Sequence, residues 1–207
     1  MHILITAFFL TIVACNKNNT QSTATANGSS TVLPDCEWCG ALEAPADINW
    51  KTTIAPHDEP GERITISGIV YRSDKKTPAE DVIIYVYNTN AKGIYAKKGN
   101  ETGNGKRHGY IRGWMKTGAD GKYEFTTVKP AAYPNTEGPA HIHITVKEEN
   151  KDEYWLEEYN FNDDPNFIKL IASKTLNAPE QDYFSYVIYP ERNDKGELTG
   201  KRDLLLK

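Results

Sequence analysis

The chain has 207 residues, with 24 Lys and Arg against 28 Asp and Glu, which gives a formal net charge of −4. This length suits one globular domain with a sizeable core plus a tail. A mildly acidic chain without a sustained basic run lacks the electrostatic footprint of a nucleic-acid-binding protein, so that class is excluded.

The first fourteen residues have the pattern of an export signal. Residues 3–14 are almost wholly apolar, and this stretch is too short to span a membrane but typical of a signal-peptide core. It leads into Cys15 in a sequence that resembles the lipobox of bacterial lipoproteins, whose cysteine is lipidated after cleavage. We therefore expect a signal peptide at residues 1–14 and an exported protein that the lipid on Cys15 anchors to the bacterial cell envelope. The segment before the apolar core has His2 but no Lys or Arg, which leaves an ordinary secretory signal as the alternative.

A tether and a cysteine pair follow. Residues 15–34 are rich in Asn, Thr, Ser, Ala and Gly, a composition typical of a flexible tether, and we expect the folded domain to span residues 35–207. Cys36 and Cys39 are separated by two residues, and such a pair in an exported chain predicts a short-loop disulfide. A redox-active pair is disfavoured because the cysteines do not lie between a strand and a helix. Half of a zinc site is disfavoured because the chain has no second cysteine pair.

The rest of the chain has the pattern of an all-β domain. Short apolar or β-branched runs alternate with turns rich in Gly, Pro, Asn and Asp, and this predicts a sandwich or a barrel. Only one helical piece is expected, near residues 165–173, where Phe167, Leu170 and Ile171 have helical spacing. Strands are expected over residues 63–71, 81–87, 122–128, 140–147, 154–161, 183–189 and 202–206.

Two histidines lie in one of the expected strands. Side chains alternate along a strand, so His141 and His143 share one face, while Ile142 and Ile144 take the other face and enter the core. Two imidazoles at this spacing can bind the same cation. A solvated or partly buried pair without a ligand is the alternative, and the His-x-His pattern alone favours it.

Tyr95 and Tyr133 are candidates for further ligands. Tyr133 precedes Pro134, which restricts its backbone to the extended region, and Tyr95 follows a glycine turn that either aims its side chain into a cavity or ends a hairpin. Because a phenol has a pKa of about 10, only a strong Lewis acid displaces its proton. Two tyrosines and two histidines together therefore select Fe(III) over Zn(II) or Cu(I). Taken singly, either tyrosine is weak evidence, since the chain has 12.

Several ordered segments of the chain resemble the intradiol ring-cleavage dioxygenases. The match covers most of residues 68–165, and a Tyr-Pro element followed closely by Pro-Ala-His-x-His is a signature of that family. The matching segments are Asn90–Tyr95 (NAKGIY), Thr117–Phe125, Val128–Pro134 (VKPAAYP), Pro139–His143 (PAHIH) and Phe161–Pro165 (FNDDP). The resemblance implies a β-sandwich that holds one non-haem Fe(III), with Tyr95, Tyr133, His141 and His143 as its ligands.

The resemblance also implies a reaction and a catalytic residue. A small aromatic diol of the catechol type binds the iron through both oxygens and loses both protons. One proton goes to the phenolate of Tyr133, which leaves the metal, and a bound hydroxide takes the other. O2 then opens the ring to a muconate-type diacid.

The chain departs from the family pattern at several positions. The family usually has an arginine three residues before the first histidine, where this chain has Gly138. That arginine is associated with stabilising negative charge on the substrate ring, an effect that is often large in catalysis. Arg107, His108 and Arg112 are candidates to replace it, and Glu158 aligns with a family glutamine near the site. The helical N-terminal dimerisation region of the catechol dioxygenases is absent.

Two classes of function stay open from the sequence. One is an exported Fe(III) intradiol dioxygenase that acts on a catechol-like or hydroxyquinol-like compound. The other is a ferric-binding β-sandwich of the cell envelope that has lost dioxygenase activity and serves in ligand binding. A weaker third interpretation is an adhesion or carbohydrate-binding module of transthyretin-like fold without a metal.

Overall fold

The computed structural model describes residues 36–175 and 184–207. The expected signal peptide, the lipidation site at Cys15 and the tether lie outside these residues, and so does the first residue of the strand expected at 183–189. Within the described ranges, no helix has both the length and the apolar character needed to cross a membrane.

The described residues are mostly in strands. The helical elements are η1 (Ala41–Glu43), α1 (Gly105–His108) and α2 (Pro165–Ala172). The strands are β1 (Lys51–Thr53), β2 (Arg63–Tyr71), β3 (Ile83–Asn88), β4 (Arg112–Lys116), β5 (Lys122–Val128), β6 (His141–Lys147), β7 (Tyr154–Trp155), β8 (Tyr159–Phe161), β9 (Val187–Ile188), β10 (Glu191–Arg192), β11 (Leu198–Lys201) and β12 (Leu204–Leu205).

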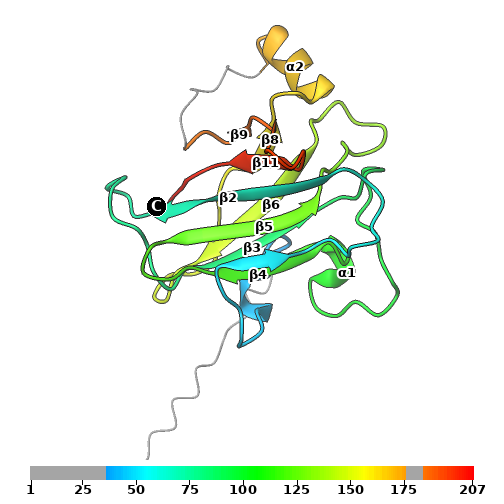
Figure 1. Ribbon diagram of the computed structural model, residues 1–207. Coiled ribbons are helices and arrows are strands. Elements are labelled where there is room, and N and C mark those ends of the chain that lie inside the picture. Colours follow the sequence, from blue (N-terminus) through cyan, green and yellow to red (C-terminus); the bar gives the residue numbers. More distant parts are fainter. Residues whose placement is uncertain (1–35, 176–183) are drawn as a thin grey trace, which may run out of the picture. The chain divides into compact units, whose positions relative to one another are not determined.

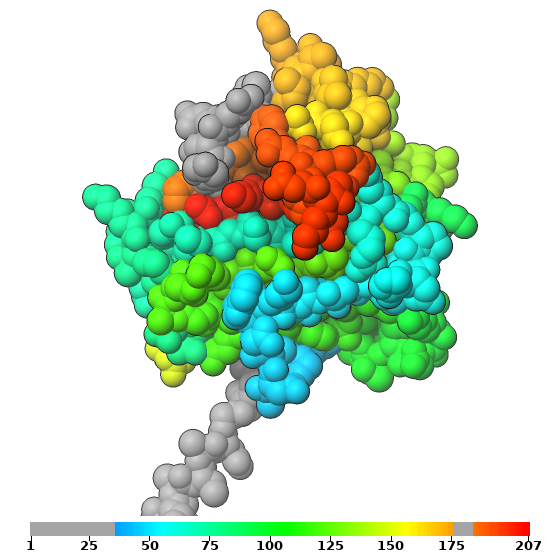
Figure 2. Space-filling model, in the orientation of Figure 1, coloured from blue at the N-terminus to red at the C-terminus, as the bar shows by residue number. Residues whose placement is uncertain are grey.

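The strands form two sheets that pack face to face, which confirms the predicted all-β sandwich (Figure 1). The first sheet has the order β1-β5-β2-β11-β10, with β12 also paired to β2, and the second has the order β4-β3-β6-β8-β9, with β7 also paired to β6. On the face shown in Figure 2, the segment that carries β1 (cyan) lies beside strand β5 of the first sheet (green). The second sheet is built around the antiparallel pair β3–β6, in which Tyr87 is opposite His143.

The expected strand bounds agree best with the structure in the long strands β2 and β5. The bounds of β2 and β5 are those expected, whereas the stretch 154–161 is divided into β7 and β8. Strands β1, β4, β10 and β11 were not expected, because they are short and their position depends on pairing with a neighbouring strand. The helix expected near 165–173 is present as α2. Its start is set by Asp164, whose side chain accepts a hydrogen bond from the backbone N–H of Phe167, and by Pro165.

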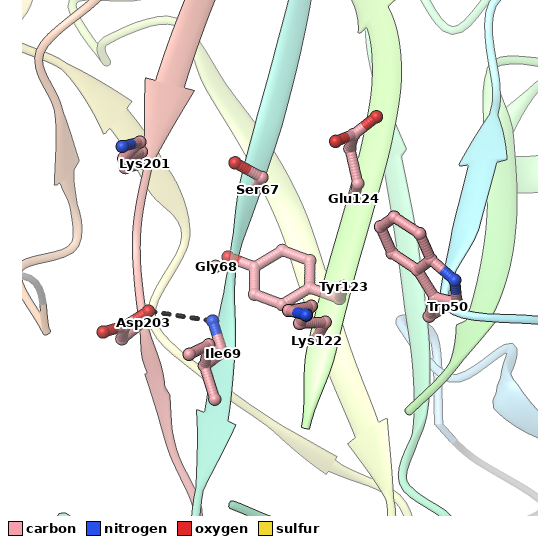
Figure 3. A pocket seen from close by; sticks show the side chains of 9 residues that line it. All are labelled: Trp50, Ser67, Gly68, Ile69, Lys122, Tyr123, Glu124, Lys201 and Asp203. Atoms are coloured by element: carbon pink, nitrogen blue, oxygen red, sulfur yellow. Dashed lines mark hydrogen bonds between the residues drawn. The ribbon is translucent and has the colours of Figure 1, made fainter. Parts of the chain in front are cut away.

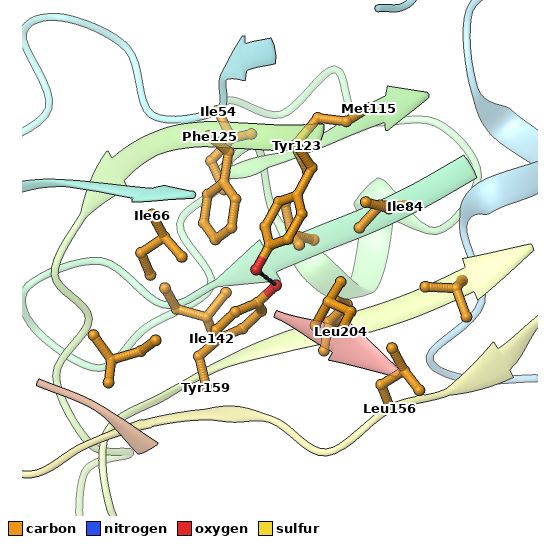
Figure 4. Close-up of a cluster of buried hydrophobic side chains, with 14 of the residues drawn as sticks. Ile54, Ile66, Ile84, Met115, Tyr123, Phe125, Ile142, Leu156, Tyr159 and Leu204 are labelled. Atoms are coloured by element: carbon orange, nitrogen blue, oxygen red, sulfur yellow. Dashed lines mark hydrogen bonds between the residues drawn. The ribbon is translucent and has the colours of Figure 1, made fainter. Parts of the chain in front are cut away.

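The core lies between the sheets and takes alternate residues of each strand. Ile142, Ile144 and Val146 of β6 are fully buried there, as the alternation predicts. Two phenols are also buried in this core and are hydrogen-bonded to each other (Figure 4). Tyr159 donates to the hydroxyl of Tyr123 at 3.2 Å, and Tyr123 donates to the backbone carbonyl of Arg202 at 2.6 Å. Both buried hydroxyls therefore have partners, as a stable interior requires.

A segment before β1 covers the outer face of the second sheet. Cys36 and Cys39 form a disulfide in it, with an S–S distance of 2.07 Å. The buried carboxylate of Glu153 accepts hydrogen bonds from the backbone N–H groups of Gly40 and Ala41 and thereby fixes the segment. At Gly40 an added Cβ would lie 2.3 Å from the ring of Tyr85, so only glycine permits this approach. The segment encloses the face of β6 that carries the two histidines.

Candidate metal centre

Four expected ligands come from three parts of the fold. Tyr95 lies between β3 and α1, Tyr133 lies between β5 and β6, and His141 and His143 lie on β6. The inward-facing residues of β6 fill the core, so the two histidines share the opposite face and are half-buried there. The alternation of β6 therefore places both imidazoles outside the core and beneath the loops that carry the tyrosines.

The two tyrosine loops meet through their backbones. The N–H of Ala131 donates to the carbonyl of Asn90 at 3.1 Å, which ties the second loop to the first. Gly93 has φ = 74°, and a Cβ there would lie 1.9 Å from the carbonyl oxygen of Ala132. A side chain at this position would separate the loops, so the glycine turn brings Tyr95 and Tyr133 together.

The four side chains converge on one point. The hydroxyls of Tyr95 and Tyr133 are in contact, the Tyr133 hydroxyl lies 2.9 Å from Nε2 of His143, and the two histidine Nε2 atoms are 3.1 Å apart. Two donors bound to one ion at about 2.1 Å lie about 3 Å apart when they are adjacent. The observed separations therefore match those of adjacent ligands of a single ion.

The protonation of the histidines supports a cation between them. Nδ1 of His141 lies 2.8 Å from the carbonyl oxygen of Pro139, which can only accept, so the proton is on Nδ1 and Nε2 has a free lone pair. Nδ1 of His143 lies 3.1 Å from the carboxylate of Glu158, which favours a proton on that nitrogen too, although the contact lacks the angle of a regular hydrogen bond. Two lone pairs then face each other at 3.1 Å, an arrangement that a bound cation stabilises.

The electrostatics of the site also select the kind of cation. Burial raises the pKa of both Tyr95 and Tyr133 above the ordinary phenol value, so both are neutral unless a metal displaces the protons. Burial lowers the pKa of His143, and its imidazole is therefore available as a neutral ligand. Displacing protons from two buried phenols requires a hard ion of high charge, and Fe(III) meets that requirement. The residues present therefore fit a ferric ion.

A stack of rings supports His143 from behind. Tyr87 stacks on His143 with ring centroids 4.5 Å apart, and His108 stacks on the other face of Tyr87 at 3.7 Å. Nε2 of His108 donates to the carbonyl of Glu37, and its Nδ1 accepts from the hydroxyl of Tyr85, each at 2.7 Å. This pattern is that of a neutral imidazole with both nitrogens satisfied. Burial lowers the pKa of His108 to about 4.

Of the four expected substrate-binding candidates, one contacts the histidines and three have other partners. It brings Glu158 directly to the histidines. Arg112 forms an ion pair with Glu43 at 2.7 Å, and the exposed Arg107 pairs with Glu37 at 3.3 Å. His108 is held in the ring stack. A role in substrate binding for these four residues stays a prediction.

Tyr87 is a residue of this site that the sequence did not indicate. The strand pattern puts Tyr85 and Tyr87 on one face of β3, but only the pairing of β3 with β6 places Tyr87 opposite His143. Alternation along β3 could therefore have predicted the face on which Tyr87 lies. It could not have predicted that His143 is its neighbour, because that depends on strand pairing.

A second depression lies away from this centre. Its volume is about 590 Å3, and its lining includes none of the four expected ligands. It lies over β2 and β5 beside Trp50, and in it the carboxylate of Asp203 accepts a hydrogen bond from the backbone N–H of Ile69 (Figure 3). Its charged groups are exposed or paired, and it lacks the convergent donors that distinguish the tyrosine–histidine site.

Comparison with known proteins relates the chain to one family. A family model described as Dioxygenase matches residues 41–182. The chain is 32% identical over 109 residues to the protocatechuate 3,4-dioxygenase beta chain of Burkholderia cepacia, covering 49% of this chain and 46% of that one. It is 31% identical over 131 residues to catechol 1,2-dioxygenase 1 of Acinetobacter lwoffii, covering 56% of this chain and 40% of that one. The chain thus matches less than half the length of these two relatives.

Comparison with solved structures shows that the fold is shared with a dioxygenase domain. The dioxygenase domain of a dioxygenase and carbohydrate-binding protein fusion from Streptomyces sp. SirexAA-E superposes with a TM-score of 0.57. The superposition covers 79% of this chain and 91% of that domain, at 22% sequence identity. At this identity the likeness establishes the shared fold.

The lowered pKa of His108 makes the free energy of unfolding depend on pH. Its pKa is about 4 in the folded chain and about 6.5 when unfolded, so between these values the unfolded chain binds a proton that the folded chain does not. The free energy of unfolding should therefore fall as the pH is lowered from 6.5 to 4. In His108→Phe, which keeps a ring on Tyr87, the fall should be smaller by up to about 1.4 kcal/mol per pH unit. Urea unfolding at several pH values measures this, and equal slopes in both proteins would contradict it.

Proposed function

The chain belongs to the intradiol ring-cleavage dioxygenase family, and from this premise we propose that it is a non-haem Fe(III) enzyme that cleaves a catechol-type diol with O2 to a muconate-type diacid. One observation supports this proposal most strongly. Two phenol oxygens and two imidazole Nε2 atoms converge, with both Nε2 lone pairs directed at the same point. The names of the relatives supply the substrate class, a small aromatic diol together with O2.

The residues that would hold the ion are Tyr95, Tyr133, His141 and His143. Bound there, a ferric ion supplies Lewis-acid chemistry and a template that orients the diol. The carbonyl of Pro139 holds His141 in the tautomer that this requires. The ring of Tyr87 holds the plane of His143 and excludes water from behind it.

Tyr133 is proposed as the residue that moves a proton. Its hydroxyl contacts both Tyr95 and His143, so it lies at the centre of the donor set. Burial raises its pKa, so its phenolate would be a strong base toward a diol hydroxyl placed beside it. It would accept one proton from the diol and hold it beside Nε2 of His143.

Export and lipid anchoring through Cys15 are a further part of the proposal. Their support is the apolar core and the cysteine that follows it in the first fifteen residues. In bacterial cells the wild-type protein should fractionate with membranes, and Cys15→Ser should appear unprocessed or in the soluble fraction. Identical fractionation and mass of the two proteins would contradict the lipid anchor.

Replacement of the tyrosines tests the metal assignment. Wild-type protein loaded with Fe(III) should show a visible tyrosinate-to-iron charge-transfer band. Tyr95→Phe and Tyr133→Phe should each shift or weaken it, because each removes one phenolate ligand. Oxygen uptake with catechol and hydroxyquinol should be lost in Tyr133→Phe.

Tyr154→Phe is the matched control, because the hydroxyl of Tyr154 is hydrogen-bonded to Glu148 instead. It should keep the band and the oxygen uptake. An unchanged band in both ligand variants would contradict the ferric site. A normal band without oxygen uptake in the wild type would instead favour a ferric-binding protein that has lost dioxygenase activity.

Gly138 offers a gain-of-function test. A Cβ at this position would have its nearest neighbour, Oγ1 of Thr136, 3.9 Å away, so a long side chain can be accommodated. Its carbonyl is held by the side chain of Asn166 at 3.0 Å, which keeps the backbone in place. Gly138→Arg restores the family's charge and should raise kcat/KM for a catechol by about tenfold or more. Gly138→Gln, which is long but neutral, should not, and an equal effect of both would contradict a charge effect.

A further inference from the structure

Glu158 gives the metal centre a second set of donors. We propose that His141, His143 and Glu158 form a divalent-cation site that shares its two histidines with the proposed ferric site. Only the sharing of the histidines depends on the proposed function, because the second site does not use the tyrosines.

The distances allow the three side chains to hold one ion. Oε2 of Glu158 lies 3.8 Å from Nε2 of His141, and the Nε2 atoms of the two histidines are 3.1 Å apart. Oε1 of Glu158 lies 3.1 Å from Nδ1 of His143, the nitrogen that carries the proton and is not a ligand atom. The three residues offer one ligand atom each, all within 4.8 Å of one another. Two donors at about 2.1 Å from one ion lie at most about 4.2 Å apart, so a small rotation of the carboxylate brings all three into range.

Among the described residues, the carboxylate of Glu158 has no Lys or Arg as an ion-pair partner. It is about two-thirds buried, with 29% of its side chain exposed, and its ion-pair partners among the described residues are the two histidines. Nδ1 of His143, which faces it, is buried and has no regular hydrogen bond. A divalent ion bound by this carboxylate and the two imidazoles would give Glu158 a cationic partner.

The chemistry of the two donor sets separates two kinds of ion. Two imidazoles and one carboxylate are a common donor set for divalent zinc and for divalent first-row transition metals. The tyrosines suit a harder ion, because they must lose protons to bind. A divalent ion bound through the two imidazoles and the Glu158 carboxylate already has one anionic ligand and does not need a phenolate.

Because the two proposed sites share their histidines, only one of the two ions can be bound at a time. His141 and His143 cannot serve two ions at once, since their Nε2 atoms are only 3.1 Å apart. A divalent ion held with Glu158 should therefore compete with ferric iron for the centre.

Cobalt is a suitable probe, since Co(II) bound to protein ligands absorbs visible light and does not need phenolates. We would titrate metal-free full-length chain with Co(II), and separately with Fe(III), in the wild type, Glu158→Gln, Tyr95→Phe and Tyr133→Phe. Glu158→Gln should weaken Co(II) binding at least about tenfold, the lower end of what loss of a metal-site partner costs, and should keep the ferric charge-transfer band. The tyrosine variants should bind Co(II) as tightly as the wild type does, and each should shift or weaken the ferric band.

Two features of the design separate the possible outcomes. Glu157→Gln is the matched control, because Glu157 is the exposed neighbour of Glu158, and it should behave as the wild type. The ferric band of Glu158→Gln also reports that this variant is folded. Unchanged Co(II) affinity in Glu158→Gln, equal loss in the tyrosine variants, or no Co(II) binding by the wild type would overturn the divalent site. A wild type that binds Co(II) but gives no ferric band would contradict the proposed function and leave the divalent site standing.

Discussion

The centre depends on one close approach between two loop backbones. Gly93 packs against the carbonyl of Ala132, and this contact brings a tyrosine from each loop to the same point. Neither loop could hold a phenol there alone, because each leaves its strand on a different sheet, β3 in the second and β5 in the first. The sandwich therefore acts as a scaffold whose two sheets each contribute one loop to the site.

The histidine side of the centre is organised by the sheet instead. Alternation along β6 commits one face to the core and leaves His141 and His143 on the other, where Tyr87 of the paired strand packs against His143. The ring stack continues to His108, which is hydrogen-bonded to Glu37 of the covering segment. The cysteine loop and the face of β6 that carries the two histidines are thus linked through buried polar contacts. Such contacts are favourable only when every nitrogen and hydroxyl has a partner.

The charges on the two sides of the histidines differ, and this difference is the basis of the two proposed ion sites. On one side of the histidines are two phenols that are neutral until a strongly polarising ion displaces their protons. On the other side is the Glu158 carboxylate, which is already anionic. Gly138, three residues before His141, has open space around it and carries no charge.

Local patterns in the sequence were sufficient to predict some elements of the fold and the candidate ligands. Alternation predicted the faces of β6, helical spacing predicted α2, and the chemistry of phenols and imidazoles favoured Fe(III) as the metal to propose. The partners of these elements could not be read from the sequence, because long-range contacts join residues far apart in the chain. Strand pairing places Tyr87 opposite His143 and β4 beside β3, and the carboxylate of Glu153 accepts a hydrogen bond from Gly40. By itself the sequence determined which residues are candidate metal ligands and which face of β6 is buried, since both follow from residue type and period. Only the tertiary structure decided that Glu158 lies against the histidines while Arg112 pairs with Glu43, because long-range packing sets those distances.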